Sequence, residues 1–173
     1  MKKKLRLLVT ERCDRNCPMC CNKKYKLASL PKVDTFAGYD EILLTGGEPM
    51  LDPYLVHRIS TAIRLENKKA KIYMYTAKTD FPHALLVVLL LKLDGITITL
   101  HEQKDVPNFI DFVVMLHTVY GVAVPRTLHV SVFKHVDIGK NRWFIEYCGW
   151  KIKDNITWQK ECPLPEGEVF MRL

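Results

Sequence analysis

Residues 4 to 20 read KLRLLVTERCDRNCPMC, an apolar run followed directly by three cysteines. Lys4 to Thr10 carries aliphatic and β-branched residues bounded by charge, which predicts a buried β-strand. The cysteines in the segment that follows, named here the cysteine loop (residues 10–22), are Cys13, Cys17 and Cys20, with the spacing C-x3-C-x2-C. Three thiolates on one loop can hold three corners of an iron–sulfur cube and leave one iron open to another ligand.

Zinc is the main alternative for these cysteines, because zinc sites also use thiolate ligands. Such sites usually pair C-x2-C with a second pair or with histidines, and no second pair exists among Cys21, Cys148 and Cys162. Iron–sulfur binding is therefore favoured over zinc, and disulfides or free thiols rank third. We expect Cys148 to be a small buried hydrophobe, whereas Cys21 could still act as an additional ligand.

A second informative stretch, residues 40 to 49, reads DEILLTGGEP. It predicts a strand over Glu41 to Thr45 that runs into a double glycine and an acid. Gly46 and Gly47 carry no side chain that would block a ligand from the backbone, and Glu48 is an acceptor for a ligand's ammonium group. A plain strand-to-helix turn would explain the same residues. The stretch gains its weight from following the cysteine loop.

Together the two stretches resemble the radical S-adenosylmethionine (SAM) superfamily, of which this chain would be a small single-domain member. The resemblance lies in residues 7–20 and 45–49. It implies that Cys13, Cys17 and Cys20 bind a [4Fe-4S] cluster whose fourth iron is chelated by SAM. It further implies that the reduced cluster cleaves SAM to a 5′-deoxyadenosyl radical, which abstracts hydrogen from a substrate.

The resemblance also implies which residues contact SAM. Gly46, Gly47 and Glu48 would hold its methionyl end. Met19 would lie beside the adenine, where the family often has an aromatic residue and an apolar thioether can fill the same space. The implied electron donor is a flavodoxin- or ferredoxin-like protein, and the implied substrate is a peptide or a small molecule such as a purine derivative.

The remainder of the chain alternates predicted strands and helices with short connections. Strands are expected over residues 71–76, 96–101, 127–136 and 155–159, and helices follow Asp52-Pro53 and cover 82–93, 107–120 and 141–150. Such alternation predicts a parallel sheet with its ligand sites at the carboxyl ends of the strands. The resemblance implies a trimmed, partial (β/α)6 TIM-like barrel. The whole chain would form one core domain with a turn-rich tail over 160–173.

Polar residues on the predicted strands supply further candidate ligands. The strand over 96–101 alternates between an apolar row and the polar row Thr97, Thr99 and His101. Helices cover the outside of a barrel, so the polar row is expected to face the site. The candidates for contact with SAM or substrate are Thr76, Thr99, His101 and Ser131, and the last shares a strand face with His129.

Composition limits the remaining functions. The 173 residues are 48% hydrophobic with a net charge of +7, which favours one globular domain with a basic surface. A solvated basic face is favoured over nucleic-acid binding. Residues 1–8 do not resemble a signal peptide, and the apolar run 85–91 is too short to span a bilayer. Thiols without an export signal predict a reducing cytoplasm.

Two alternatives to this interpretation stay open. A glycyl-radical-enzyme activase would also be small, but it would carry a longer lead before the cysteine loop. A non-catalytic α/β module, stabilised by zinc or a cluster and binding nucleic acid through its basic face, would use the cysteines structurally. The module ranks second because it gives no reason for the Gly-Gly-Glu-Pro turn.

Overall fold

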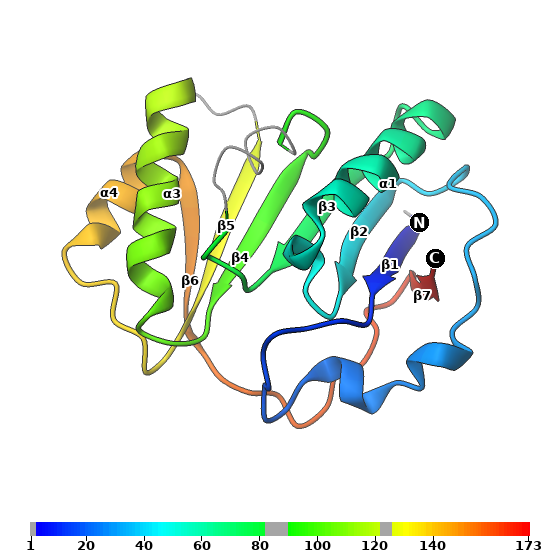
Figure 1. Ribbon diagram of the computed structural model, residues 1–173, viewed down its shortest axis with the longest axis horizontal. Helices are drawn as coiled ribbons and strands as arrows, with labels where there is room; N and C mark the ends of the chain where they lie inside the picture. The colour runs from blue at the N-terminus through cyan, green and yellow to red at the C-terminus, as the bar shows by residue number, and fades with distance from the viewer. Residues whose placement is uncertain (1–2, 82–89, 122–125) are drawn as a thin grey trace. The chain divides into compact units, whose positions relative to one another are not determined.

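The structure is a computed structural model that describes residues 3–81, 90–121 and 126–173 (Figure 1). Its strands form one seven-stranded, all-parallel sheet with the order β6-β5-β4-β3-β2-β1-β7. They are β1 (Lys4–Thr10), β2 (Glu41–Gly46), β3 (Lys71–Thr76), β4 (Gly95–Leu100), β5 (Thr127–Phe133), β6 (Trp150–Ile156) and β7 (Glu168–Arg172). The predicted α/β class and parallel strands are confirmed, but the sheet does not close into a barrel.

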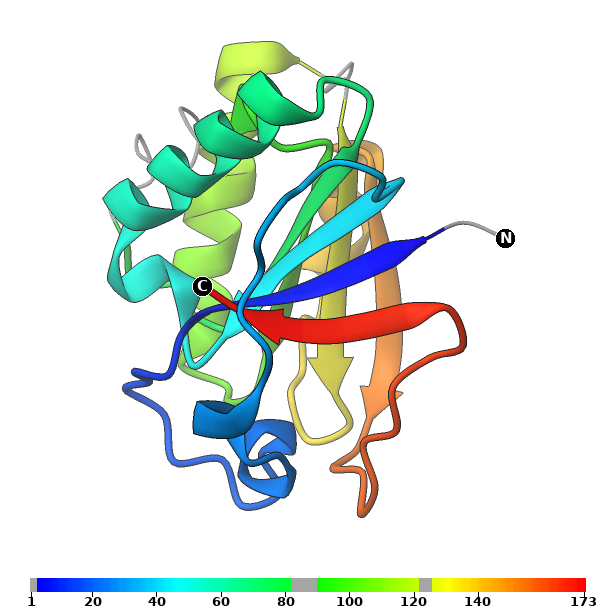
Figure 2. The same ribbon diagram turned by 90° about the vertical axis from the view of Figure 1, so that its right-hand side faces the viewer.

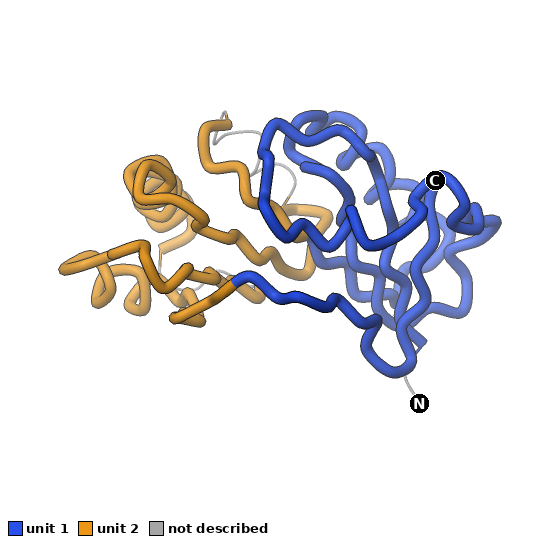
Figure 3. The backbone as a smooth tube through the Cα atoms, turned by 90° about the horizontal axis from the view of Figure 1, so that it is seen from below, with its two compact units in different colours: residues 1–74, 158–173 blue, residues 75–157 orange. Residues whose placement is uncertain are grey.

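The described helices connect these strands. The α-helices are α1 (Pro53–Glu66), α3 (Asp105–Tyr120) and α4 (Asn141–Tyr147), and the short 3-10 helices are η1 (Cys21–Lys24), η2 (Leu27–Ser29) and η3 (Pro49–Leu51). The chain folds as two compact units, residues 1–74 with 158–173 and residues 75–157 (Figure 3). The helix predicted over 82–93 falls mainly outside the described residues.

The first unit is built around β1, which pairs in parallel with β2 on one side and β7 on the other (Figure 2). Leu5 and Leu7 of β1 are fully buried, as is Ile63 of α1. The start of α1 follows the predicted signals: Asp52 accepts a hydrogen bond from the Leu55 amide at 2.9 Å, and a proline occupies the first turn. The buried aliphatic residues of β1 and the Asp52 cap of α1 thus explain why these two elements form where the sequence predicts them.

The tail predicted to be turn-rich contains a strand, β7, and this is the clearest error in the expected topology. Lys4 pairs with Glu168, and the same carboxylate forms an ion pair with Arg6. One turn precedes β7, where the Glu168 amide donates to the Pro165 carbonyl at 3.1 Å, and the strand itself is only five residues long. Its stability comes from pairing with β1 at the other end of the sequence, and local propensity does not encode that pairing.

The predictions for residues 141–159 are also corrected. The helix expected to reach Trp150 ends at Tyr147, and Trp150 instead begins β6. Gly149 has φ +83°, a left-handed conformation that turns the chain out of a helix at low steric cost. The strand predicted to begin at Asn155 therefore starts five residues earlier.

The second unit packs α3 and α4 against one face of β4, β5 and β6. The rings of Phe109 and Phe112 meet the Trp150 ring with centroid distances of 5.0 and 6.0 Å. The apolar row of β4 is buried beneath the helices, as expected. Helix α3 begins before the predicted Pro107, because the buried Asp105 carboxylate accepts hydrogen bonds from the amides just after β4.

Candidate functional site

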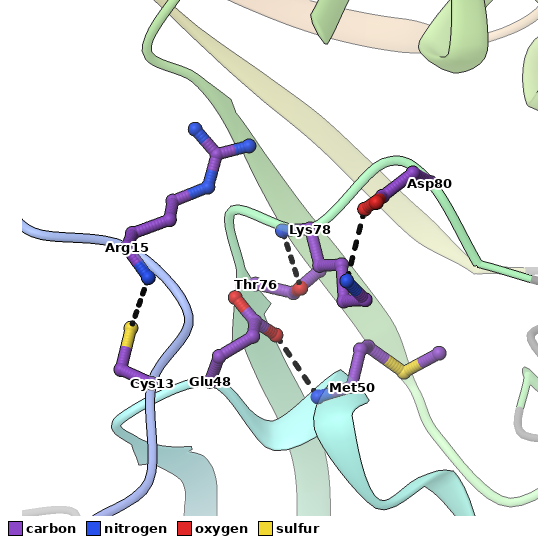
Figure 4. Close-up of polar contacts among 7 residues, drawn as sticks. All are labelled: Cys13, Arg15, Glu48, Met50, Thr76, Lys78 and Asp80. Atoms are coloured by element: carbon purple, nitrogen blue, oxygen red, sulfur yellow. Dashed lines mark hydrogen bonds and ion pairs between the residues drawn. The ribbon is translucent and has the colours of Figure 1, made fainter.

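The cysteine loop leaves the carboxyl end of β1 and runs into η1. Cys13 is exposed, while Cys17 and Cys20 are partly buried. The Arg15 amide donates a hydrogen bond to the Cys13 sulfur at 3.5 Å (Figure 4), and the Lys23 ammonium donates to the Cys17 carbonyl oxygen at 3.2 Å. The three predicted metal ligands thus share one short segment that local contacts hold against η1.

The surroundings of Cys13 and Cys17 disfavour the thiolate forms of both residues. Burial raises the pKa of Cys17, and the neighbouring Cys20 and Cys13 raise it further. Burial also raises the pKa of Cys13, and the Glu48 carboxylate adds to that rise. A bound metal cation would favour the thiolate forms that these raised pKa values disfavour, because metal-bound thiols are deprotonated.

The loop's donors fit a metal centre in their chemistry but are not gathered around a common point. Three thiols are the soft donor set that zinc and iron–sulfur clusters take. Across residues 3–81, 90–121 and 126–173, however, no three His, Cys, Asp or Glu side chains are arranged to hold a metal ion. A metal centre here therefore requires the cysteine loop to draw its sulfurs together.

The double glycine packs against the start of the cysteine loop, and that it holds SAM stays a prediction. The Gly47 amide donates to the Thr10 carbonyl at 2.7 Å, and the Glu48 amide donates to the Arg12 carbonyl at 2.8 Å. A Cβ on Gly47 would stand 1.9 Å from the Arg12 carbonyl oxygen. The glycines are needed because the start of the cysteine loop lies directly on them.

Glu48 is a buried carboxylate with a structural bond of its own. Its side chain is 2% exposed and accepts a hydrogen bond from the Met50 amide at 2.9 Å, which caps η3 (Figure 4). The Glu48 carboxylate helps to raise the pKa of Cys13, so its charge lies within electrostatic range of that thiol. Met19 is partly buried on the cysteine loop. That these two residues contact SAM stays a prediction.

Cys21 and Cys162 form a disulfide, with their Cα atoms 5.6 Å apart. The bridge ties the end of the cysteine loop to the C-terminal tail, where the Tyr25 hydroxyl also donates to the Cys162 carbonyl. Cys21 is thereby no longer an additional metal ligand, and Cys148 is buried as expected. Disulfides persist in oxidising compartments, so this bridge does not support the expected reducing cytoplasm. The sequence alone does not predict this bridge, because the two cysteines are 141 residues apart.

Polar residues of β4, β5 and β6 meet on the sheet face opposite α3 and α4. Two rows cross the strands in register: one joins Thr97, His129 and Lys151, and the other joins Thr99, Ser131 and Lys153. They line a cavity of about 470 Å³ together with Tyr75, Ile152 and Ile156. We call this cavity the polar groove.

Thr99 and Ser131 were predicted as separate candidates, and the parallel register places them side by side. That they contact SAM or substrate stays a prediction. The two lysines were missed, because residues 141–150 were predicted as helix and the next strand was expected only from 155. The signal that could have found them is the alternation of Lys151, Ile152 and Lys153 directly after a helix-ending glycine.

The other two strand-end candidates lie elsewhere in the second unit. Thr76 is buried and its hydroxyl accepts a hydrogen bond from the Lys78 amide at 3.1 Å (Figure 4). The His101 ring packs edge-on against Phe133 at a centroid distance of 4.8 Å, and its amide donates to Asp105. Neither side chain lines the polar groove.

Comparison with known proteins adds no assignment. No family model matches the chain, and no curated protein matches its sequence. Within the described part of the chain, no helix combines the length and the apolar character that a membrane crossing needs. The functional interpretation therefore rests on the motifs and on the geometry of the site.

Proposed function

We propose that this chain is a radical SAM enzyme in which Cys13, Cys17 and Cys20 hold a [4Fe-4S] cluster. The observation that carries the proposal is a C-x3-C-x2-C loop emerging from the carboxyl end of the first strand of a parallel sheet. That edge is where parallel sheets place their ligand sites. The sequential order of β1 to β6 supports a partial (β/α)6 barrel as the finer description of the fold.

A reduced cluster and SAM together would supply hydrogen-atom abstraction. The chain's own residues position and shield these groups. The buried Glu48 carboxylate, within electrostatic range of Cys13, suits the ammonium of SAM. Met19, partly buried on the cysteine loop, suits the adenine. A flavodoxin- or ferredoxin-like protein would deliver the electron, and the substrate would be a small molecule or a peptide.

The second candidate is a zinc- or cluster-stabilised module that binds nucleic acid. This module ranked second from the sequence because it gives no reason for the Gly-Gly-Glu-Pro turn. The close approach of Arg12 to Gly47 now accounts for that glycine without SAM. The choice between the two candidates therefore depends on the metal that the cysteines bind and on whether SAM is cleaved.

The test is SAM cleavage after anaerobic cluster reconstitution. The protein is treated with dithionite and SAM, and 5′-deoxyadenosine is quantified by chromatography. We expect the product with the unaltered protein and with Cys148→Ala, which removes a buried thiol outside the cysteine loop. We expect none with Cys17→Ala. Product formation that survives Cys17→Ala, or its absence from an iron-loaded protein, would refute the proposal.

A further inference from the structure

The polar groove lies on the sheet face that points away from α3, as the position of Trp150 shows. Trp150 is buried against α3 through Phe109 and Phe112. Successive side chains of a strand point to opposite faces, so Lys151 and Lys153 point away from the helices. The in-register rows bring these lysines beside His129 and Ser131 of the neighbouring strand.

The polar groove is electropositive. Within the described part of the chain, no carboxylate lines it, and neither lysine forms an ion pair. The nearest acid along β6, Asp154, pairs with Arg142 at 2.6 Å. Burial lowers the pKa of His129, and the positive charge of Lys151 lowers it further. Two lysines therefore face the groove without a negative partner among the described residues.

Hydroxyl groups and apolar surface complete the lining. Thr97, Thr99 and Ser131 provide hydroxyl donors, which can bond the oxygens of an anion. Tyr75 and Ile156 add apolar surface. A volume of about 470 Å³ lies within the size range of small-molecule pockets and suits a ligand with one charged end and one less polar end.

We propose that the polar groove binds a small organic phosphate, with the phosphate between Lys151 and Lys153 and the organic part against Tyr75 and Ile156. The phosphate group of a monoester has about three terminal oxygens, which two ammonium groups and several hydroxyls can share. A carboxylate has only two acceptor oxygens. A volume of about 470 Å³ matches a small phosphate in size. The groove includes Thr99 and Ser131, two of the candidates for contact with SAM or substrate, but its test needs no cluster, so failure of phosphate binding and failure of the proposed function are distinguishable.

The test measures binding of adenosine 5′-monophosphate to the full chain by titration calorimetry, with inorganic phosphate as competitor and adenosine as the uncharged comparison. The test variant is Lys151→Gln/Lys153→Gln. The matched control is Lys134→Gln/Lys140→Gln, which removes the same charge from exposed positions outside the groove. Circular dichroism checks that both variants fold, and the imidazole NMR signal of His129 reports binding in the unaltered protein.

We expect the monophosphate to bind, inorganic phosphate to compete, and the groove variant to weaken binding by at least about tenfold, as the loss of charge-assisted hydrogen bonds predicts. The control should change binding less than about twofold, and the ligand should shift the His129 signal. No binding at millimolar concentration, equal affinity for adenosine, or equal weakening in the control would overturn the proposal. Tighter binding of single-stranded oligonucleotides, weakened equally by both variants, would show a general basic surface and overturn it too.

Discussion

Replacing Gly47 with alanine tests how the cysteine loop is held to the sheet. The new Cβ would stand 1.9 Å from the Arg12 carbonyl oxygen and 2.7 Å from the Glu11 carbonyl oxygen. Both obstacles are backbone atoms, which cannot rotate away as a side chain can. Gly47 is not in the left-handed region, so the strain of the substitution comes from contact with the cysteine loop.

The cost follows from the movement that the contact demands. Cβ atoms essentially never approach other atoms within 3.0 Å, so the start of the cysteine loop must retreat by roughly 1 Å. That movement breaks or weakens the bonds from the Gly47 and Glu48 amides, each contributing about 1 kcal/mol. Overpacking typically adds about 1–3 kcal/mol. Gly47→Ala should therefore lower the free energy of unfolding by about 3–5 kcal/mol.

The assay is urea unfolding monitored by circular dichroism, with Gly38→Ala as the control. Gly38 has φ +80° but open space around its Cβ position, so its substitution should cost only about 1–2 kcal/mol. Thiol labelling should also be faster in Gly47→Ala, because the cysteine loop is released. A Gly47→Ala variant no less stable than Gly38→Ala would refute the proposed role of close backbone contact.

Three further predictions concern other contacts. Cys162→Ser should remove the bridge to Cys21, lower the free energy of unfolding by up to about 5 kcal/mol for a loop of this length, and make the Cys21 thiol reactive in nonreducing alkylation followed by mass spectrometry. Asp52→Ala should cost about 1 kcal/mol in urea unfolding through loss of the α1 cap, and Asp52→Asn much less. Burial and Lys151 lower the pKa of His129 in the folded protein. The contribution of His129 to the free energy of unfolding is therefore fully present above the ordinary pKa of histidine, and it is lost as the pH falls through the lowered pKa of the folded protein. Lys151→Gln should raise that pKa in an NMR titration, and an unchanged or lower value would contradict the assignment.

Much of the fold could be predicted because it depends on local signals. Both β1 and β3 have the predicted bounds, and α1 begins at the predicted cap. The alternation in β4 placed its apolar row under the helices and its polar row on the other face. In each case the residues that determine the structure are neighbours in sequence.

The rest depends on contacts that local pattern does not encode. Strand β7 exists through pairing with β1, and the bridge between Cys21 and Cys162 joins the two ends of the first unit. The role of Gly47 depends on where Arg12 passes in space. The sequence singled out this turn, but the contact with Arg12 that requires a glycine became visible only in three dimensions.

The most direct test of the central claim is the metal content of the cysteine loop. After anaerobic reconstitution, iron, acid-labile sulfide and zinc are quantified per chain in the unaltered protein, Cys17→Ala and the buried-thiol control Cys148→Ala. We predict about four irons per chain in the unaltered protein and in the control, with a stable cluster lost in Cys17→Ala. Stoichiometric zinc without iron, or a cluster indifferent to Cys17→Ala, would contradict the claim.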